Sequence, residues 1–220
     1  MRATVVLAVA AVLAVTTGCT DTPSATPSAS PTPPPLQSSA PTAPTLPTAS
    51  TPELTPLPSP SKPWPTPKVT GTPADDAPLA DRITFAIARQ AQIAAGRAAA
   101  TTVNCPGLEH AEKPGRHDLT CKVTYAGRPY SGQLVVEAKQ YSATYKFTSE
   151  FVPITRVKVV DAVQRTAPGA AQVTCTMEAV AVVNHADQQG IACDVTTTAN
   201  AVQPYKAVVS GDGRVLVAKA

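Results

Sequence analysis

Proline is the feature that most limits what this chain can fold into. The 220-residue sequence contains 24 prolines, and 18 of them lie between Thr20 and Pro78 together with 20 Ser and Thr residues. Proline fixes φ, lacks a backbone N–H and disfavours helical backbone in the residue before it. The stretch therefore predicts an extended, disordered spacer, residues 19–78, and the 142 residues after it, 79–220, remain for one ordinary domain or two very small ones.

The charge and length of the remaining part exclude some functional classes. Residues 79–220 carry 15 basic and 11 acidic side chains, a net charge of +4. This charge is too weak and too scattered for a nucleic-acid surface, so no nucleic-acid partner is expected. A large enzyme is excluded by the length.

The N-terminal residues 1–18 predict an export signal. Arg2 is followed by the apolar run Ala3–Val15. As a helix this run reaches about 20 Å, less than the roughly 30 Å core of a bilayer. Its Gly-Cys ending resembles a bacterial lipobox, although Thr16 replaces an aliphatic residue. The resemblance implies cleavage before Cys19 and a lipid anchor on that cysteine. Ordinary secretion and an uncleaved anchor are the alternatives.

Trp64 is the only tryptophan and lies within the spacer, between two prolines. It is a candidate docking residue, and stacking on its own prolines is the alternative interpretation. The spacer itself would hold the folded part away from the membrane, at the outer face of the cell membrane or within the cell wall.

The four remaining cysteines recur at similar spacing. The members of the two pairs are 16 and 18 residues apart, and the pairs are offset by 70 and 72 residues: Cys105, Cys121, Cys175 and Cys193. Similar residues surround them, and Pro129–Tyr130 is matched to Pro204–Tyr205 further on. The pattern predicts a duplicated unit, with a first repeat at 79–151 and a second at 152–220.

Each repeat is predicted to be one helix packed on a roughly four-stranded antiparallel sheet, an α+β fold. The first helix is expected over 81–99 with Asp81 as its N-cap. The second follows Pro153 and ends before Pro168, with Ile154, Val157, Val160 and Gln164 on one face. This segment is rich in β-branched residues, so a strand is the alternative. Each repeat is expected to begin its sheet with a short strand through its first cysteine, and further strands are expected at 119–125, 130–138, 144–149, 191–198, 205–210 and 214–218.

The cysteine pairs are predicted to be disulfides. An exported chain meets oxidising conditions, and a 70-residue unit gains about 3 kcal/mol from closing a loop of about 15 residues. The duplication selects Cys105 with Cys121 and Cys175 with Cys193, because each unit would have closed its own bridge. A metal site is the alternative, but no close Cys-x-x-Cys pair is present.

The first repeat resembles a known domain. Val103–Leu108 and Leu119–Val123 are similar to a small two-cysteine domain of unknown function in exported actinobacterial lipoproteins, and the second repeat departs from it at Thr176–Glu178. The resemblance implies no catalytic residue. The tandem architecture also loosely resembles the secreted β-lactamase inhibitor protein, which implies protein inhibition as an alternative function.

Histidines lie in the first intercysteine loop. His110 and His117 stand among acidic residues that could bind a metal or act in acid–base chemistry. The loop is also rich in charged residues, as solvated loops are. A small envelope enzyme or metal binder is therefore an alternative only, and we expect no catalytic residue, metal or cofactor.

Six of the eight aromatic residues of the folded part lie between 125 and 151. Core packing is one interpretation. The other is that tyrosines among them anchor an envelope protein or glycan, since tyrosine offers a large contact area at little entropic cost. The candidate binding residues are Tyr125, Tyr130, Tyr141 and Tyr145. The expected function is a cell-envelope lipoprotein that presents a non-catalytic tandem binding or scaffolding module.

Overall fold

The computed structural model describes residues 54–187 and 189–220, so the predicted signal and most of the predicted spacer lie outside the described residues. The described residues combine helices with antiparallel sheets and belong to one compact unit. The prediction of a mixed helix-and-sheet fold with antiparallel strands and two disulfides is confirmed.

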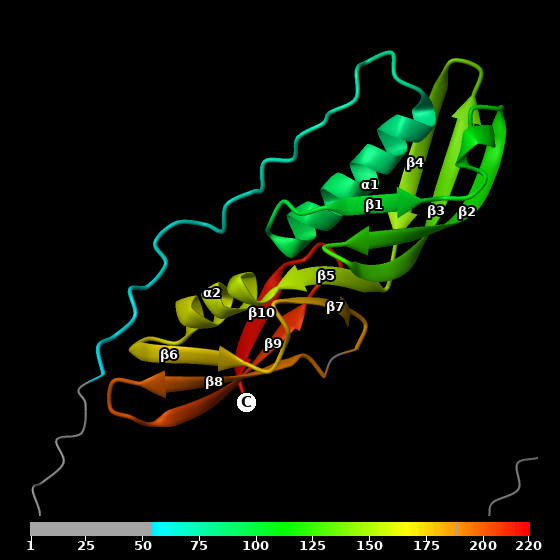
Figure 1. Ribbon diagram of the computed structural model, residues 1–220. Helices are drawn as coiled ribbons and strands as arrows, with labels where there is room; N and C mark the ends of the chain where they lie inside the picture. Colours follow the sequence, from blue (N-terminus) through cyan, green and yellow to red (C-terminus); the bar gives the residue numbers. More distant parts are fainter. Residues whose placement is uncertain (1–53, 188) are drawn as a thin grey trace, which may run out of the picture. The chain divides into compact units, whose positions relative to one another are not determined.

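The first sheet is a four-stranded antiparallel meander (Figure 1). Its strands follow one another in chain order: β1 (Thr101–Asn104), β2 (Gly115–Tyr125), β3 (Arg128–Lys139) and β4 (Ser142–Thr148). A short 3₁₀ helix, Leu108–His110, lies between β1 and β2. Alternate residues of β3 from Tyr130 to Ala138 are buried, because one face of the sheet covers a core and the other meets solvent.

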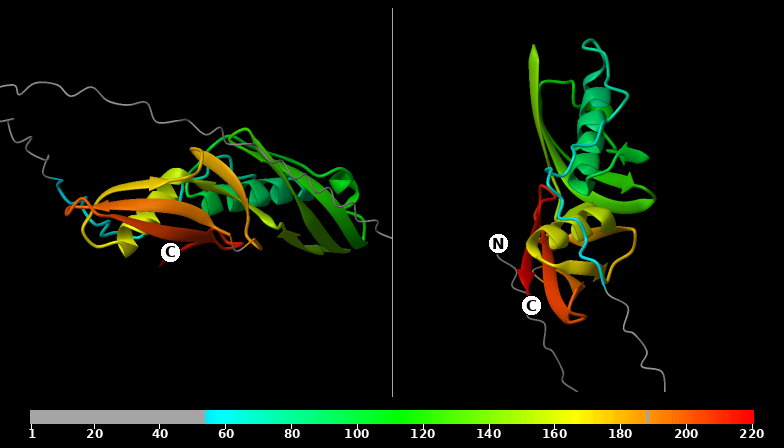
Figure 2. Two further views of the ribbon diagram at one scale, coloured as in Figure 1. Left: turned by 90° about the horizontal axis from the view of Figure 1, so that it is seen from below. Right: turned by 90° about the vertical axis from the view of Figure 1, so that its left-hand side faces the viewer.

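Helix α1 (Leu79–Ala95) lies against this sheet (Figures 1 and 2). Ile83, Ile87, Ala91 and Ala95 recur every four residues and are all buried, which places one stripe of the helix on the core. The predicted N-cap was wrong: the helix begins after Pro78, and Asp81 lies in the first turn. Proline suits this position, since its fixed φ fits a helix start and the first N–H groups have no partner inside the helix.

The second sheet has the order β10-β9-β8-β6, also antiparallel. Helix α2 contacts its strands β6, β9 and β10 (Figure 1). A two-stranded sheet that the sequence did not predict lies beside it. The bounds are β5 (Phe151–Thr155), α2 (Arg156–Thr166), β6 (Ala170–Cys175), β7 (Val180–Asn184), β8 (Ile191–Thr197), β9 (Val202–Val209) and β10 (Val215–Lys219).

The second helix buries a different face from the one predicted. Val159 and Val163 are fully buried, whereas Val157 is 60% exposed. Ile154 is buried too, but in β5, which ends only at Thr155. Val157, Val159, Val160 and Val163 are all apolar, so spacing alone fits more than one stripe. The pairing of β5 with β7 fixes where the helix starts and hence which stripe faces inward.

The C-terminal end of α1 meets the segment around α2. The last carbonyls of a helix have no partner within it. Here Thr155 Oγ1 donates to the carbonyl of Ala95 at 2.9 Å, and Lys158 Nζ donates to that of Ala94 at 2.7 Å. A positive charge at this end also suits the helix dipole. The two helices are thus joined by polar contacts as well as by packing.

Residues 57–67, here called the strap, belong to the predicted spacer yet lie on the fold. They form no helix or strand. The backbone N–H of Leu57 donates to the carbonyl of Ala170 at 2.7 Å, and the indole N–H of Trp64 donates to the carbonyl of Gly96 at 3.0 Å. Figure 1 shows the strap as the cyan trace that passes α2 before the chain reaches α1. The C-terminal part of the predicted spacer is therefore in contact with the domain.

Candidate binding groove

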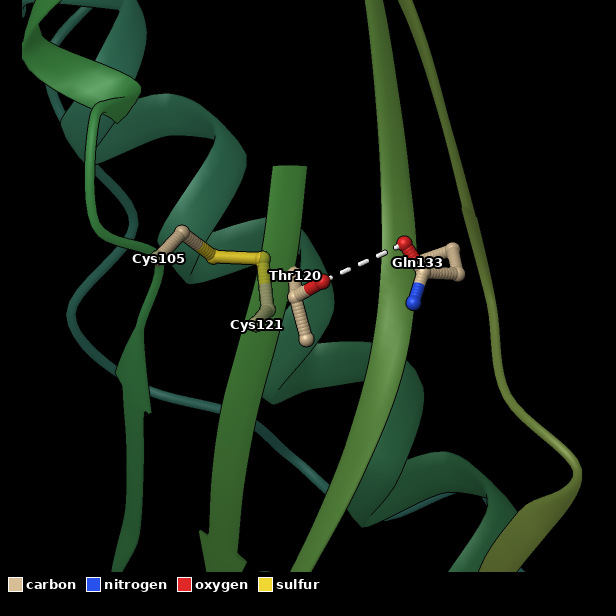
Figure 3. The surroundings of a disulfide bond; sticks show 4 residues. All are labelled: Cys105, Thr120, Cys121 and Gln133. Atoms are coloured by element: carbon tan, nitrogen blue, oxygen red, sulfur yellow. Dashed lines mark hydrogen bonds between the residues drawn. A yellow bond between two sulfur atoms is a disulfide. The ribbon is translucent and has the colours of Figure 1, made fainter. Parts of the chain in front are cut away.

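The two predicted disulfide pairings are confirmed. Cys105 is bonded to Cys121 with a Cα–Cα distance of 4.2 Å, and Cys175 to Cys193 with one of 4.0 Å. Each joins two neighbouring antiparallel strands or their ends. Figure 3 shows the first bond, buried beside the outward-facing pair Thr120 and Gln133, whose side chains are joined by a hydrogen bond. These disulfides indicate an oxidising environment.

Cys19, the predicted lipidation site, lies outside the described residues. Within residues 54–187 and 189–220, none of the helices has the length and apolar character needed to cross a bilayer.

The four candidate tyrosines fall into two groups. Tyr125 is fully buried, with its hydroxyl donating to the carbonyl of Arg97 at 2.8 Å, and Tyr130 is buried as well. Both pack in the core beneath the first sheet. Tyr145 is 44% exposed on β4, and Tyr141, in the turn between β3 and β4, is 90% exposed. Only Tyr141 and Tyr145 therefore offer a partner any ring surface.

The histidine loop makes contacts within itself. His110 lies 3.5 Å from the carboxylate of Glu109, and the ring of His117 contacts the backbone carbonyl of Lys113 at 2.8 Å. Glu112 accepts a hydrogen bond from the backbone N–H of Leu79 at the start of α1. Among the described residues, no three His, Cys, Asp or Glu side chains gather as a possible metal site.

A groove opens where β4 bends into β5. It has a volume of about 630 Å³ and is called the bend groove below. Its lining comes from α1, from β3, from the bend itself and from two later loops: Gln90, Ser131, Gly132, Gln133, Phe147, Thr148, Ser149, Glu150, Phe151, His185 and Gly211. The volume lies within the range of small-molecule sites, about 300–1,000 Å³.

Hydrogen bonds hold the backbone of this bend in place. Ser149 Oγ donates to the carbonyl of Ser131 at 2.7 Å and accepts from the backbone N–H of Phe151 at 3.0 Å. The ring of His185 contacts the carbonyl of Ser149 at 3.0 Å, and its backbone N–H donates to the carbonyl of Glu150 at 2.9 Å. Ser149 and His185 are therefore used in shaping the groove.

Other side chains of the bend groove remain available to a ligand. Phe151 is 41% exposed, and Phe147 is half-buried and covers Gly132, where an added Cβ would lie 2.4 Å from the Phe147 ring. Gln90 brings an exposed amide group. Gln133 and Thr148 are exposed too, but they pair with each other on the outer face of the sheet, opposite to Phe147, and the Gln133 amide oxygen accepts from Thr120. With the amide of Gln90 and the carboxyl of Glu150, the groove combines aromatic rings with donors and acceptors. It can bind a ligand that has both apolar faces and hydroxyl or amide groups.

Sequence reasoning missed most of these residues as a site. Phe147 and Phe151 belong to the aromatic cluster that the sequence shows, but Gln90, His185 and Gly211 are distant in sequence and carry no motif. The cluster of aromatic residues before 151 is the one signal that pointed to this part of the chain.

The chain matches no known protein-family model, no curated protein and no solved structure.

Proposed function

We propose that this chain is an exported, membrane-anchored lipoprotein whose folded part is a non-catalytic binding module for a cell-envelope glycan. The observation that carries the proposal is the bend groove, which is lined by the half-exposed ring of Phe151 together with Gln90 and Glu150.

The chemistry of the groove favours a saccharide. A sugar ring has an apolar face that stacks on an aromatic side chain, and a rim of hydroxyls that exchange hydrogen bonds with amides and carboxylates. The space of about 630 Å³ fits a few sugar units. The groove is open, so a long saccharide chain could extend beyond it. Its polar side chains come from different elements and could contact successive sugar units.

The N-terminal sequence supports export and anchoring. The disulfides require oxidising conditions, which the space outside the cytoplasmic membrane supplies. The lipobox-like ending at Cys19 and the proline-rich residues after it are those of a lipid-anchored domain held on a spacer. Two acyl chains would anchor it firmly, since one chain alone binds only marginally.

Matching strand registers support a duplicated unit. In the first sheet Val103 pairs with Val123, and in the second Val173 pairs with Val195. Each first strand runs into the first cysteine of its pair, and each second strand contains the second cysteine. We infer that residues 79–151 and 152–220 descend from one unit, a helix followed by a four-stranded meander, with β7 added within the second intercysteine segment.

Anchoring is tested by the intact mass of the protein isolated from its native membrane, with and without reduction. A mass that begins at Cys19 and includes acyl chains supports the anchor. A product cleaved elsewhere and free of lipid contradicts it.

Glycan binding is tested by cosedimentation of the soluble chain with purified bacterial peptidoglycan. Phe151→Ala and Gln90→Ala are expected to weaken binding about tenfold each, as loss of about 1.4 kcal/mol of contact would. Tyr141→Ala, His110→Ala and His117→Ala are matched controls outside the groove and should bind like the wild type. Equal sedimentation of the wild type and Phe151→Ala would contradict the proposal.

Tyr141 supports a second candidate function, inhibition of an extracellular enzyme. Its ring is 90% exposed at the tip of the β3–β4 hairpin, where a rigid pair of strands could insert it into the cleft of another protein. This candidate predicts the reverse result, in which Tyr141→Ala abolishes inhibition of a secreted hydrolase and Phe151→Ala does not.

A further inference from the structure

The strap is held mainly through its backbone. Gln164 Nε2 donates to the carbonyl of Pro58 at 2.6 Å, and Arg165 Nη1 donates to that of Pro60 at 3.0 Å. Arg165 Nη2 donates to the carbonyl of Lys62. Two consecutive side chains of α2 thus donate hydrogen bonds to alternate backbone carbonyls of a proline-rich segment.

The side chain of Arg165 is also held by a contact within α2. Its guanidinium forms two hydrogen bonds with the carboxylate of Asp161, at 2.6 and 3.1 Å, one turn earlier on α2. This pairing leaves the remaining N–H groups directed at the strap. A planar guanidinium with several donors suits such a role better than a lysine ammonium does.

Trp64 contributes a side-chain hydrogen bond that fixes the register of the strap. Its indole N–H donates to the carbonyl of Gly96, beyond the end of α1. Along the strap only Pro60, Trp64 and Pro67 are half-buried, while the residues between them are exposed. The half-buried residues are four and three positions apart and the bonded carbonyls two apart, as in an extended proline-rich segment that lies along the surface.

The strap does not close off the surface beneath it. A cavity of about 800 Å³ lies between the strap, α2 and β10, lined by Trp64, Lys158, Arg165 and Leu216 among others. The strap is therefore attached at a few points and is not packed into a core. Few attachment points and exposed hydrogen bonds are typical of a segment that dissociates readily.

We propose that the face of α2 formed by Gln164 and Arg165 is a binding site for extended, proline-rich segments, and that its resident ligand is this chain's own strap in a reversible intramolecular complex. Backbone carbonyls carry no side-chain identity, so the site recognises an extended proline-rich backbone, and the tryptophan sets the register. A linked segment acts at an effective concentration in the millimolar range, so even weak contacts keep it largely bound.

Release of the strap would change the reach of the anchored domain. Residues 57–78 would then add to the spacer predicted before them, and 22 residues at about 3.1 Å each add up to about 70 Å. The site therefore couples occupancy by a proline-rich segment to the distance between the domain and its anchor.

Trp64 is the sole tryptophan of the sequence and lies in the strap, so its fluorescence reports whether the strap is bound to the domain. In the full chain, acrylamide should quench the fluorescence of Trp64 several-fold less than in a free peptide of residues 54–68. Arg165→Ala should raise the quenching to the peptide's level with an unchanged far-ultraviolet circular dichroism spectrum. Arg89→Ala, which removes an exposed arginine of α1, is the matched control and should leave the quenching as in the wild type.

Two further measurements separate the possible explanations. Arg165→Lys keeps the charge but not the forked donors, so it should release the strap as Arg165→Ala does. The 54–68 peptide with Trp64→Phe, added at millimolar concentration, should displace the strap and raise the quenching of the wild-type chain. A tryptophan as exposed in the wild type as in the free peptide, or full docking in Arg165→Ala, would overturn the proposal.

Discussion

Gly213 shows how closely two distant segments approach. It has φ of +79°, and a Cβ added there would lie 2.4 Å from Ala94 Cα and 2.5 Å from the Ala94 carbonyl oxygen in α1. Neither backbone atom can move without shifting the helix. The turn between β9 and β10 can contact α1 only because this residue has no side chain.

Gly213→Ala should therefore destabilise the protein more than the same substitution at a glycine that has a positive φ but no close neighbour. Gly169 has a φ of +73° with no atom within 4 Å of an added Cβ, which makes Gly169→Ala the matched control. We expect a loss of about 1–2 kcal/mol for the control from its backbone conformation. Gly213→Ala should lose a further 1–3 kcal/mol, roughly, from overpacking. Urea denaturation measures both, and equal losses would show that the contact with Ala94 is unimportant.

Buried tyrosines should make the fold sensitive to alkali. Burial raises the pKa of Tyr130 and of Tyr125 above the ordinary value of 10. The unfolded chain then releases these protons at lower pH than the folded chain, so stability is complete below pH 10 and is lost as the pH rises through the raised values.

Tyr130→Phe should flatten this alkaline loss. The variant has no phenolic proton at the most strongly shifted position, so its free energy of unfolding should fall less as the pH rises above about 10, where unfolded tyrosine ionises and the buried residue does not. Tyr141→Phe, at an exposed position, is the control and should follow the wild type. Denaturant midpoints at each pH measure the effect, and parallel curves for Tyr130→Phe and the wild type would contradict it.

At the residue scale, the disulfide partners could be predicted from the sequence, whereas the exposure of the tyrosine side chains could not. The pairing of Cys105 with Cys121 followed from spacing and from the recurrence of the pair. The burial of Tyr125 and the exposure of Tyr141 depend on which face of the sheet meets α1 and where a hairpin turns. That information comes from tertiary packing, which a lone aromatic residue in the sequence does not carry.

At the scale of elements, the end of α1 depends on donors from another part of the chain. Thr155 is itself buried, and its hydroxyl satisfies the buried carbonyl of Ala95. Lys158 Nζ donates a hydrogen bond to the neighbouring carbonyl of Ala94. Burial lowers the pKa of this lysine, and the charge of Asp212 opposes that shift. These two residues join the first helix to the second.

Thr155→Val keeps the shape of the side chain but removes its donor. An unsatisfied buried carbonyl costs about 1–3 kcal/mol, and that is the loss of stability we expect. Thr166→Val is the control, since the Thr166 hydroxyl bonds the Ala162 carbonyl within its own helix at an exposed position. Thermal unfolding of both variants measures the difference. A loss no larger than that of the control would mean that water replaces the threonine hydroxyl.

Most strands and the first helix could be predicted from periodicity, whereas the second helix was placed by its position in the repeat. Strands β5 and β7 pair with each other across α2 and β6, so their pairing has no local signal. The matching of Pro129–Tyr130 with Pro204–Tyr205 is also offset: Cys121 faces Gly132, whereas Cys193 faces Tyr205. A shift of two residues leaves side chains on the same face, so both tyrosines are buried and the sequence looks equally plausible either way.

At the scale of the whole folded part, each of the two hydrophobic cores contains residues from the other half of the sequence. Ala94 belongs to α1 but packs in the core beneath the second sheet. Val180 and Val182 belong to β7 but pack against the core beneath the first sheet. Each core is therefore completed by an element from the other part of the sequence, which should make the described fold unfold as one unit.

Removing one disulfide should consequently weaken both halves. Cys105→Ala with Cys121→Ala releases a loop closed across 16 residues, which costs about 3 kcal/mol. If the cores are cooperative, hydrogen exchange in β8 of the second sheet should accelerate along with exchange in β2 of the first. The reciprocal variant, Cys175→Ala with Cys193→Ala, should do the same to β2. Acceleration confined to the sheet that lost its bridge would show instead that the two cores unfold independently and that Ala94, Val180 and Val182 couple them only weakly.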